Sequence, residues 1–264
     1  MTVQNQTNKS NVWDFWRRLD YATPDQFGDL FRTIAHEDIN WNGSQPLNQI
    51  IGIDGVVAQV WQPLRAAFPD LKRQTDIFLG GTSGGDEWVS AHGYLIGTFA
   101  NDWLGIPATG RKAHLRFGQF YIMREGKISE SYLIFDMLDL IRQAGFQMLS
   151  PSRGAEGGKV IADMTGNGVL LLEQDALATR QTAQLVGEMI RGMRRYKRDR
   201  DGADLRSMTS GDQWHPNFHW YGPCGIGSCY TREEYEDIHQ RPWRSRTAFL
   251  RRPRVGDGRG WHFG

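Results

Sequence analysis

The chain has 264 residues, of which 39 % are hydrophobic and 23 % are charged, and its formal net charge is +1. These proportions are typical of a soluble globular protein, and the balanced charge argues against nucleic acid as a partner. Because no apolar run is long enough to span a bilayer and the polar start MTVQNQTNKSN lacks the apolar core of a signal peptide, we expect no membrane contact and a cytoplasmic location.

The N-terminal part of the chain is expected to be mainly helical. A first helix is predicted around Val12–Leu19. A second begins after Thr23, a favoured N-cap that is followed by proline, and its apolar residues recur at helical spacing. These apolar residues are Phe27, Leu30, Phe31 and Ile34. A short strand over 36–42 and a helix over 52–68 follow, and Pro63 is expected to kink or break that helix.

The composition then changes to aromatic and β-branched residues separated by turn signals, a pattern typical of strands. Four strands are predicted, over 71–81, 86–99, 111–123 and 127–136. Glu125-Gly126 favours a tight hairpin turn, and a short helix over 137–145 ends at Gly145. This order predicts an α+β fold in which N-terminal helices cover one face of a curved antiparallel sheet. A strong bend leaves a hollow between the layers, and the 10 Trp, 13 Phe and 8 Tyr are residue types that line small-molecule pockets.

The C-terminal part of the chain repeats some of the N-terminal pattern. Residues 148–174 begin rich in glycine, serine and proline and are expected to form a linker. Residues 175–264 are expected to be a partial second copy of the first domain. The aligned pairs are Trp41 with Trp220 and Gly43 with Gly222. Because no strands follow, the tail is partly disordered, or it packs on the first domain or a partner chain, or the protein is a truncated tandem, which we favour.

The two cysteines, Cys224 and Cys229, lie in a glycine-rich loop and are expected to be free thiols. Together with His215 and His219 they do not match the spacing of a zinc site, so no metal is predicted. The sequence contains no P-loop, no dinucleotide fingerprint and no nucleophile elbow, and we therefore expect no cofactor.

The stretch LGIPATGRKAHLRFGQFYIMREGKISESYLIFDMLDLIRQAG resembles the SnoaL-like polyketide cyclases of the nuclear-transport-factor-2-like superfamily. The matching pieces are the Gly-Ile-Pro-Ala-Thr-Gly turn at 105–110, the Arg-Glu-Gly-Lys-Ile hairpin at 124–128, Glu130, Asp136, Gln-Ala-Gly at 143–145 and, upstream, Ala-Phe-Pro-Asp at 67–70. The resemblance covers about residues 23–147 and implies a cone-shaped, cystatin-like α+β roll over 10–147. The segment WHPNFHWYGPCGIGS, followed by His239, resembles the second half of tandem members of the group.

Asp136 is the first candidate for chemistry because it ends an apolar strand. Removal from water raises the pKa of a carboxylate toward the range useful for a general base. In SnoaL-like cyclases the aspartate at this motif position removes a proton from a carbon next to a carbonyl, and the enolate closes a ring. The resemblance implies that role for Asp136. The alternative is structural, since Asp is a favoured N-cap for the helix that starts at Met137.

Two neighbouring strands carry further candidates. His92 shares a strand face with Tyr94 and is a candidate acid or hydrogen-bond donor, with a satisfied core histidine as the alternative. His114 and Arg116 share a face of the next strand, where Arg116 binds a substrate carbonyl or carboxylate or else forms a surface cross-strand pair. The predicted catalytic residues are Asp136 and His92, and the predicted substrate-binding residues are Trp41, Tyr94, His114, Arg116 and Tyr132. Plain core packing is the alternative for Trp41.

Three hypotheses for function follow. The first is a cofactor-free cyclase or lyase in which Asp136 is the general base acting on a small carbonyl substrate. The second is a non-catalytic module that binds a small molecule. Cyclases of this type often carry Thr-His before the Gly-Ile-Pro turn, whereas this chain has Thr98-Phe99, which favours the second hypothesis. The third is an interaction domain, because cone folds commonly form homodimers through the open face of the sheet.

Overall fold

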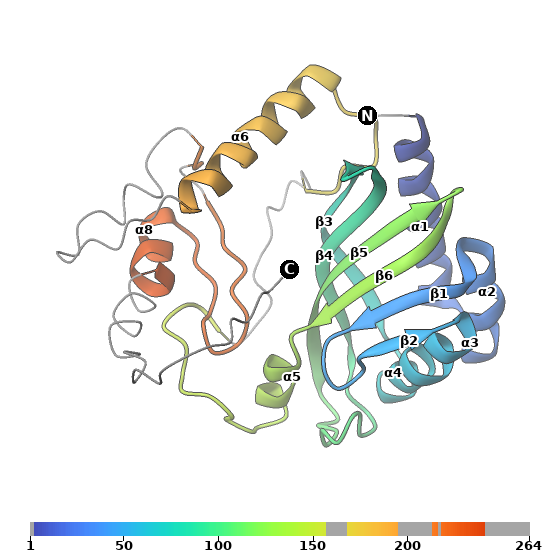
Figure 1. The fold of residues 1–264 in the computed structure, drawn as a ribbon. Helices are drawn as coiled ribbons and strands as arrows, with labels where there is room; N and C mark the ends of the chain where they lie inside the picture. The colour runs from blue at the N-terminus through green and yellow to red at the C-terminus, as the bar shows by residue number, and fades with distance from the viewer. Residues whose placement is uncertain (1–2, 157–167, 195–212, 216–217, 241–264) are drawn as a thin grey trace, which may run out of the picture. The chain divides into compact units, whose positions relative to one another are not determined.

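The computed structural model describes residues 3–156, 168–194, 213–215 and 218–240 (Figure 1). The chain divides into two units. The first comprises Met1–Pro151, Glu156–Gln184 and Pro223–Gly225, and the second comprises Ser152–Ala155, Leu185–Gly222 and Ile226–Gly264. None of the helices in the described ranges is long and apolar enough to cross a membrane.

Helix α1 (Val3–Tyr21) is much longer than the predicted segment 12–19. Its C-terminal half buries the apolar side chains of Val12, Phe15, Trp16 and Leu19. Its N-terminal half is polar, yet parts of it are buried because they find distant partners. Asn8 donates to Glu87 Oε2 at 2.7 Å, and Lys9 Nζ donates to the carbonyl oxygen of Leu170 at 2.6 Å.

The next helices follow the predicted pattern with one change. After the 3₁₀ turn Pro24–Gln26, helix α2 (Phe27–Ile34) buries its four predicted apolar residues. Helices α3 (Ile53–Val56) and α4 (Gln62–Ala67) are joined by a π turn over Val57–Trp61. Pro63 lies in the first turn of α4, where no intrahelical N–H is required, and the wider π turn before it absorbs the interruption.

The sheet has six strands in the order β2-β1-β6-β5-β4-β3. They are β1 (Ala35–Gly43), β2 (Gln49–Ile51), β3 (Lys72–Ser83), β4 (Asp86–Thr98), β5 (Lys112–Arg124) and β6 (Lys127–Phe135). The last four form the predicted antiparallel meander. The sheet is not wholly antiparallel, however, because β1 pairs in parallel with β6. The long chain segment between these two strands makes that pairing possible, since parallel neighbours need a long connection.

Two turns confirm the local predictions at the end of the meander. Glu125 and Gly126, between β5 and β6, both have positive φ, at 53° and 76°. That combination is typical of the tight hairpin turn whose twist matches the flanking strands. Helix α5 (Met137–Gln143) follows β6, and Gly145 has a φ of 95°, a conformation suited to glycine after a helix.

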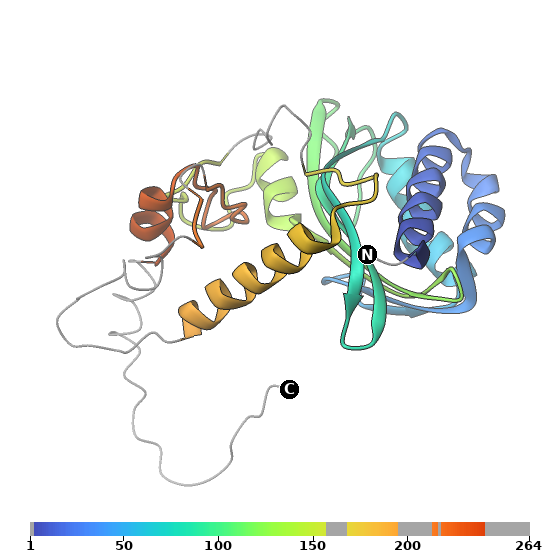
Figure 2. The same ribbon diagram turned by 90° about the horizontal axis from the view of Figure 1, so that it is seen from above.

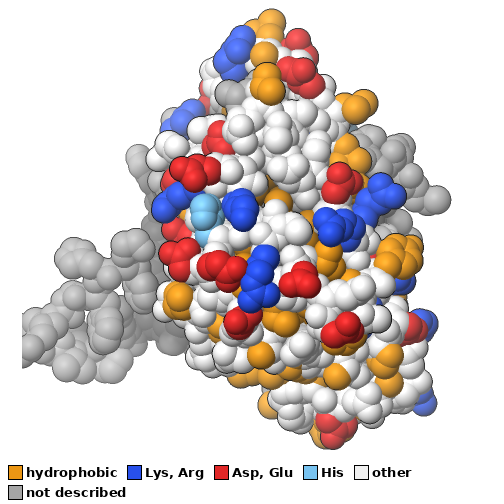
Figure 3. Space-filling view, turned by 90° about the vertical axis from the view of Figure 1, so that its right-hand side faces the viewer, with side chains coloured by type: hydrophobic (Ala, Val, Ile, Leu, Met, Phe, Trp, Pro, Cys, Tyr) orange, Lys and Arg blue, Asp and Glu red, His pale blue; other side chains and the backbone are white. Residues whose placement is uncertain are grey.

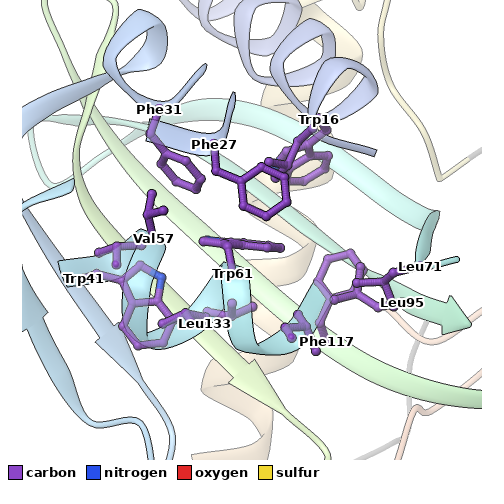
Figure 4. Close-up of a cluster of buried hydrophobic side chains, with 14 of the residues drawn as sticks. Trp16, Phe27, Phe31, Trp41, Val57, Trp61, Leu71, Leu95, Phe117 and Leu133 are labelled. Atoms are coloured by element: carbon purple, nitrogen blue, oxygen red, sulfur yellow. The ribbon is translucent and has the colours of Figure 1, made fainter. Parts of the chain in front are cut away.

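Helices α1 to α4 cover one face of the sheet, which we call the inner face; the opposite face is the outer face (Figures 1 and 2). The core lies between these helices and the inner face, where aromatic and aliphatic side chains from both layers meet (Figure 4). Phe68 and Phe99 are fully buried there and stack with ring centroids 4.7 Å apart. The α+β fold with helices on a curved sheet is therefore confirmed.

Asp70, in the Phe-Pro-Asp motif, fastens the end of β4. Its Oδ1 accepts the backbone N–H of Thr98 at 2.6 Å, and its Oδ2 accepts the Thr98 hydroxyl at 2.9 Å. Lys112 of β5 pairs with the same carboxylate. The hydrogen bond from Lys112 has the largest effect on the pKa of Asp70 and that from the Thr98 amide the next largest, and together they hold this pKa well below its usual range. The motif thus ties the chain after α4 to two strands of the meander.

The last part of the predicted linker lies against the sheet. The Phe78 amide of β3 donates to the Gly168 carbonyl at 2.8 Å, and the Leu170 amide donates to the Phe78 carbonyl at 2.8 Å. The free edge of β3 is therefore partly covered, which is a common way to protect an exposed strand edge. Composition alone did not indicate this pairing.

The second unit has a small core of its own. Helix α6 (Ala176–Arg194) runs from the first unit into the second, and the short helix α8 (Arg232–Glu234) continues into a π turn over Tyr235–Gln240. Trp214, Cys229 and Tyr235 are buried together. Aromatic contacts join Trp214 to Tyr235 at 5.7 Å and Phe218 to Tyr235 at 5.3 Å.

Local geometry around the repeated tryptophans is alike in the two units. Trp41 pairs antiparallel with the residue nine positions later, and so does Trp220. In each case a helix begins twelve positions after the tryptophan and continues into a π turn. A Cβ on Gly43 or on Gly222 would lie 2.3 Å from the indole two residues before it. These features agree with a diverged second copy, which stays a prediction; its expected end, 241–264, lies outside the described residues.

Candidate functional site

The strand register decides which predicted site residues share a face. Tyr94 pairs with Arg116, and His114 pairs with Ile96, so these side chains emerge on the outer face together with His92. Trp41 instead belongs to the core and is 2 % exposed. The structure therefore brings most of the predicted residues together and places Trp41 on the opposite side of the sheet.

Five of the predicted residues form what we call the outer-face cluster: His92, Tyr94, His114, Arg116 and Asp136. The Tyr94 ring is at the centre, with its centroid 6.1 Å from that of His92 and 6.4 Å from that of His114, both edge-to-face. The guanidinium carbon of Arg116 lies 5.8 Å from the same ring centroid. Tyr94 is only 1 % exposed, so the cluster is packed around a buried aromatic ring.

Asp136 joins the cluster where β6 ends. Its own amide donates to the carbonyl oxygen of Arg116 at 3.0 Å. Its Oδ1 accepts the amide of Asp139 at 3.2 Å, which confirms the predicted helix cap, and its Oδ2 accepts the amide of Cys224 at 3.0 Å. Burial raises the pKa of Asp136, while the Cys224 amide and the positive charge of Arg116 lower it, and the net direction is upward.

His92 is held in its neutral form. Burial, reinforced by the nearby positive charge of Arg116, lowers the pKa of His92 to about 4. A neutral imidazole carries one N–H donor and one acceptor nitrogen. At neutral pH the cluster therefore presents an uncharged ring next to a guanidinium.

Tyr132 lies on the outer face but is engaged elsewhere. It is 37 % exposed, and its hydroxyl donates to Glu130 Oε2 at 2.9 Å. That hydrogen bond to a carboxylate raises the pKa of Tyr132. Glu130 also lies 3.7 Å from Arg124, so Tyr132 forms part of a surface network.

Arg73 is a residue that the sequence reading missed. It stands on β3 opposite Leu95, a core residue, and its guanidinium lies among aromatic rings of the interior. A cavity of about 90 Å³ adjoins it. Strand alternation did not indicate it, because Arg73 stands among polar residues and a β-bulge between Thr75 and Ile77 shifts the register before the core residue Phe78.

Larger recesses lie on the surface of the first unit. One of about 880 Å³ is walled by α1 and α2, and another of about 300 Å³ lies between β1 and the β5–β6 hairpin. Charged side chains of both signs are interspersed on the face shown in Figure 3. No field of a single sign gathers there to favour a highly charged ligand.

The two cysteines carry free thiols, as predicted. Burial raises the pKa of Cys224 and of Cys229 to about 11 in each case. A reactive cysteine needs a lowered pKa, because the thiolate is the nucleophile. Neither thiol is therefore prepared for nucleophilic chemistry at neutral pH.

Comparison with known proteins gives one family. The family described as SnoaL-like polyketide cyclase matches residues 14–144. No curated protein matches the sequence significantly.

Solved structures with similar folds cover about half of this chain. A SnoaL-like polyketide cyclase from Agrobacterium tumefaciens strain C58 is 20 % identical, with a TM-score of 0.40, and the match covers 54 % of this chain and 98 % of that one. TsrD from Streptomyces laurentii is 20 % identical, with a TM-score of 0.42 and coverage of 52 % and 96 %. A nuclear-transport-factor-2-like protein of unknown function from Burkholderia pseudomallei K96243 is 19 % identical, with a TM-score of 0.41 and coverage of 52 % and 95 %.

Proposed function

Residues 14–144 of this chain belong to the SnoaL-like polyketide cyclase family, and from this premise we propose that the domain is a cofactor-free cyclase or lyase acting on a small carbonyl compound. The reaction takes place at the outer-face cluster. Asp136 removes a proton from a carbon next to a carbonyl group. The resulting enolate attacks a second carbonyl of the same substrate, and the proton returns to the new alkoxide.

The proposal is supported by two groups near the Arg116 guanidinium whose pKa values are shifted in opposite directions. The pKa of Asp136 is raised and that of His92 is lowered to about 4, and Arg116 influences both. Groups whose pKa values are pushed apart in one site are typical of acid–base assignments. A carboxylate with a raised pKa is a better proton acceptor, and each Asp136 oxygen has a second lone pair besides the one that accepts the hydrogen bond from a backbone amide.

His92 and Arg116 supply the stabilisation that an enolate needs. A neutral imidazole can donate its N–H to a carbonyl oxygen, and a guanidinium lowers the energy of negative charge that develops on it. Both groups are held against the Tyr94 ring, so they need little reorganisation during the reaction. No metal or cofactor takes part in this scheme.

Binding without turnover is the second candidate, and one observation favours it. Phe99 occupies the position where the resemblance expects a histidine, and it is fully buried against Phe68. This position therefore contributes packing and cannot supply an acid. In that case the same cluster holds a carbonyl ligand through Arg116 and His92 but performs no proton transfer.

Asp136→Asn tests the proposal. Asparagine is also a favoured N-cap, so the variant keeps the start of α5 while it removes the basic carboxylate. We would follow deuterium uptake from solvent at the α-carbon of polyketide-like aryl ketones and β-keto esters, together with ligand-induced thermal shifts. The expected result is loss of exchange by a factor of about 100 or more, with thermal shifts retained.

Asp25→Asn, at an exposed aspartate in the turn before α2, is the control and should behave as the wild type. Unchanged exchange in Asp136→Asn would exclude this residue as the base. Thermal shifts without any exchange in the wild type would favour the binding module instead.

A further inference from the structure

Arg73 directs its guanidinium into the interior between the helices and the sheet. Its partner in the register is Leu95, which is 2 % exposed, so both side chains are on the inner face. The guanidinium carbon lies 4.2 Å from the ring of Trp16, 4.7 Å from that of Phe117 and 5.8 Å from that of Trp61. Figure 4 shows these three rings converging in the core from α1, from β5 and from the π turn before α4.

Two buried N–H groups near the Arg73 guanidinium lack hydrogen-bond acceptors. Arg73 Nε is buried without a hydrogen-bond partner, and so is Trp61 Nε1. Among the residues that the structure describes, no acidic side chain lies within ion-pair distance of the Arg73 guanidinium. Asp20 is close, but its Oδ2 accepts the backbone N–H of Arg73 at 3.1 Å. Buried polar groups almost always find partners, so the unmatched Nε of Arg73 indicates a missing acceptor.

A cavity provides the space for that acceptor. It has a volume of about 90 Å³. Its lining residues are Trp13, Trp16, Arg17, Asp20, Arg73 and Thr75. A water molecule takes about 30 Å³ of the liquid, so the space suits about three waters or one carboxylate with a short carbon stem. Arg17 is exposed, which places the mouth of the cavity at the surface and leaves room for the rest of a larger ligand.

We propose that this cavity binds the carboxylate of a small organic acid, with Arg73 as its principal partner. Guanidinium N–H groups lie in one plane and match the two oxygens of a carboxylate, while aromatic rings interact with the cation through their faces. The flat walls of Trp13 and Trp16 suit an unsaturated or aromatic stem. An uncharged carbonyl would offer one acceptor and no charge, and it would leave the cation uncompensated.

The electrostatics of Arg73 agree with an anionic ligand. Burial lowers the pKa of Arg73, and this effect is opposed by the nearby Tyr121 and Asp20. A bound carboxylate would favour the charged guanidinium further. This site is independent of the chemistry proposed for the outer-face cluster, because the sheet separates the two.

Acetate is the probe and acetamide its uncharged control, each titrated at constant ionic strength into the full chain. The Nε–H resonance of Arg73 is followed by ¹⁵N-edited NMR. Acetate is expected to give a saturable shift of this resonance and acetamide none. Arg73→Met keeps the aliphatic stem but removes the guanidinium, and titration calorimetry with acetate should show binding to this variant weakened at least about tenfold, whereas binding to the exposed-site variant Arg111→Met should be unchanged.

The midpoint of thermal unfolding of Arg73→Met should equal or exceed that of the wild type, because an uncompensated cation has been removed. Equal responses to acetate and acetamide, or no saturable shift in the wild type, would overturn the proposal. Should Arg73→Met fail to fold, the wild-type comparison still decides, since the observed resonance belongs to Arg73 itself.

Discussion

The buried ring of His92 is expected to make the stability of the first unit depend on pH. Its pKa is about 4 in the folded protein, against an ordinary histidine pKa of 6.5. Between these two values the folded protein binds fewer protons than the unfolded chain, so the free energy of unfolding rises with pH. The stabilisation is complete above about pH 6.5 and is lost as the pH falls toward 4. The total is on the order of 3 kcal/mol, and about 2 kcal/mol of it should disappear between pH 7 and pH 5.

Urea unfolding at pH 7, 6 and 5 measures this effect. The variant His92→Gln removes the titrating ring, and His36→Gln, at a partly exposed histidine, serves as the matched control. Between pH 7 and pH 5, the free energy of unfolding of the wild type and of His36→Gln should each fall by about 2 kcal/mol more than that of His92→Gln. Comparing changes with pH, and not absolute stabilities, removes the packing cost of the substitution itself.

Two results would refute this reasoning. One is a wild type and a His92→Gln variant that lose stability in parallel over this range. The other is an NMR titration of the His92 ring with a midpoint near that of an exposed histidine. Either result would mean that the ring is hydrated in solution, and the neutral donor assigned to it in the proposed reaction would be lost with it.

Two further predictions concern stability. Asp70→Asn should lower the free energy of unfolding at pH 7 by about 1 kcal/mol, since the pairs of Asp70 are largely exposed. Because folding lowers the pKa of Asp70, its contribution is present above about pH 4 and is lost as the pH falls, so urea unfolding of the variant should approach that of the wild type at pH 2. Gly93→Ala would bring a Cβ to 2.1 Å from the carbonyl oxygen of Gln74 and should cost about 1–3 kcal/mol in the same assay. Gly81→Ala meets no atom within 4 Å and should change stability by less than about 0.5 kcal/mol; equal effects of the two glycine variants would contradict the packing argument.

The part of the candidate site that depends on strand alternation could be predicted from the sequence. Residues two apart on one strand share a face, so the grouping of His92 with Tyr94 and of His114 with Arg116 follows from parity alone. The opposite parity of Phe99 likewise places it in the core. Alternation within one strand does not show which side chains of a different strand lie on the same face of the sheet. The sequence therefore could not show that Trp41 of β1 lies on the face opposite to His92 and Tyr94.

By itself the sequence determined the four strands of the meander, the hairpin turn at Glu125 and the cap at Asp136. These features are encoded in alternation and turn residues within about ten positions of each other. Only the tertiary structure decided the polar first half of α1, the parallel pairing of β1 with β6 and the enclosure of Arg73. Each depends on partners far away in the chain: Lys9 is buried because the carbonyl oxygen of Leu170 accepts its hydrogen bond, and Arg73 is enclosed because Trp16 of α1 packs across it. Local patterns specify the elements, but burying a charge depends on long-range contacts that no local pattern contains.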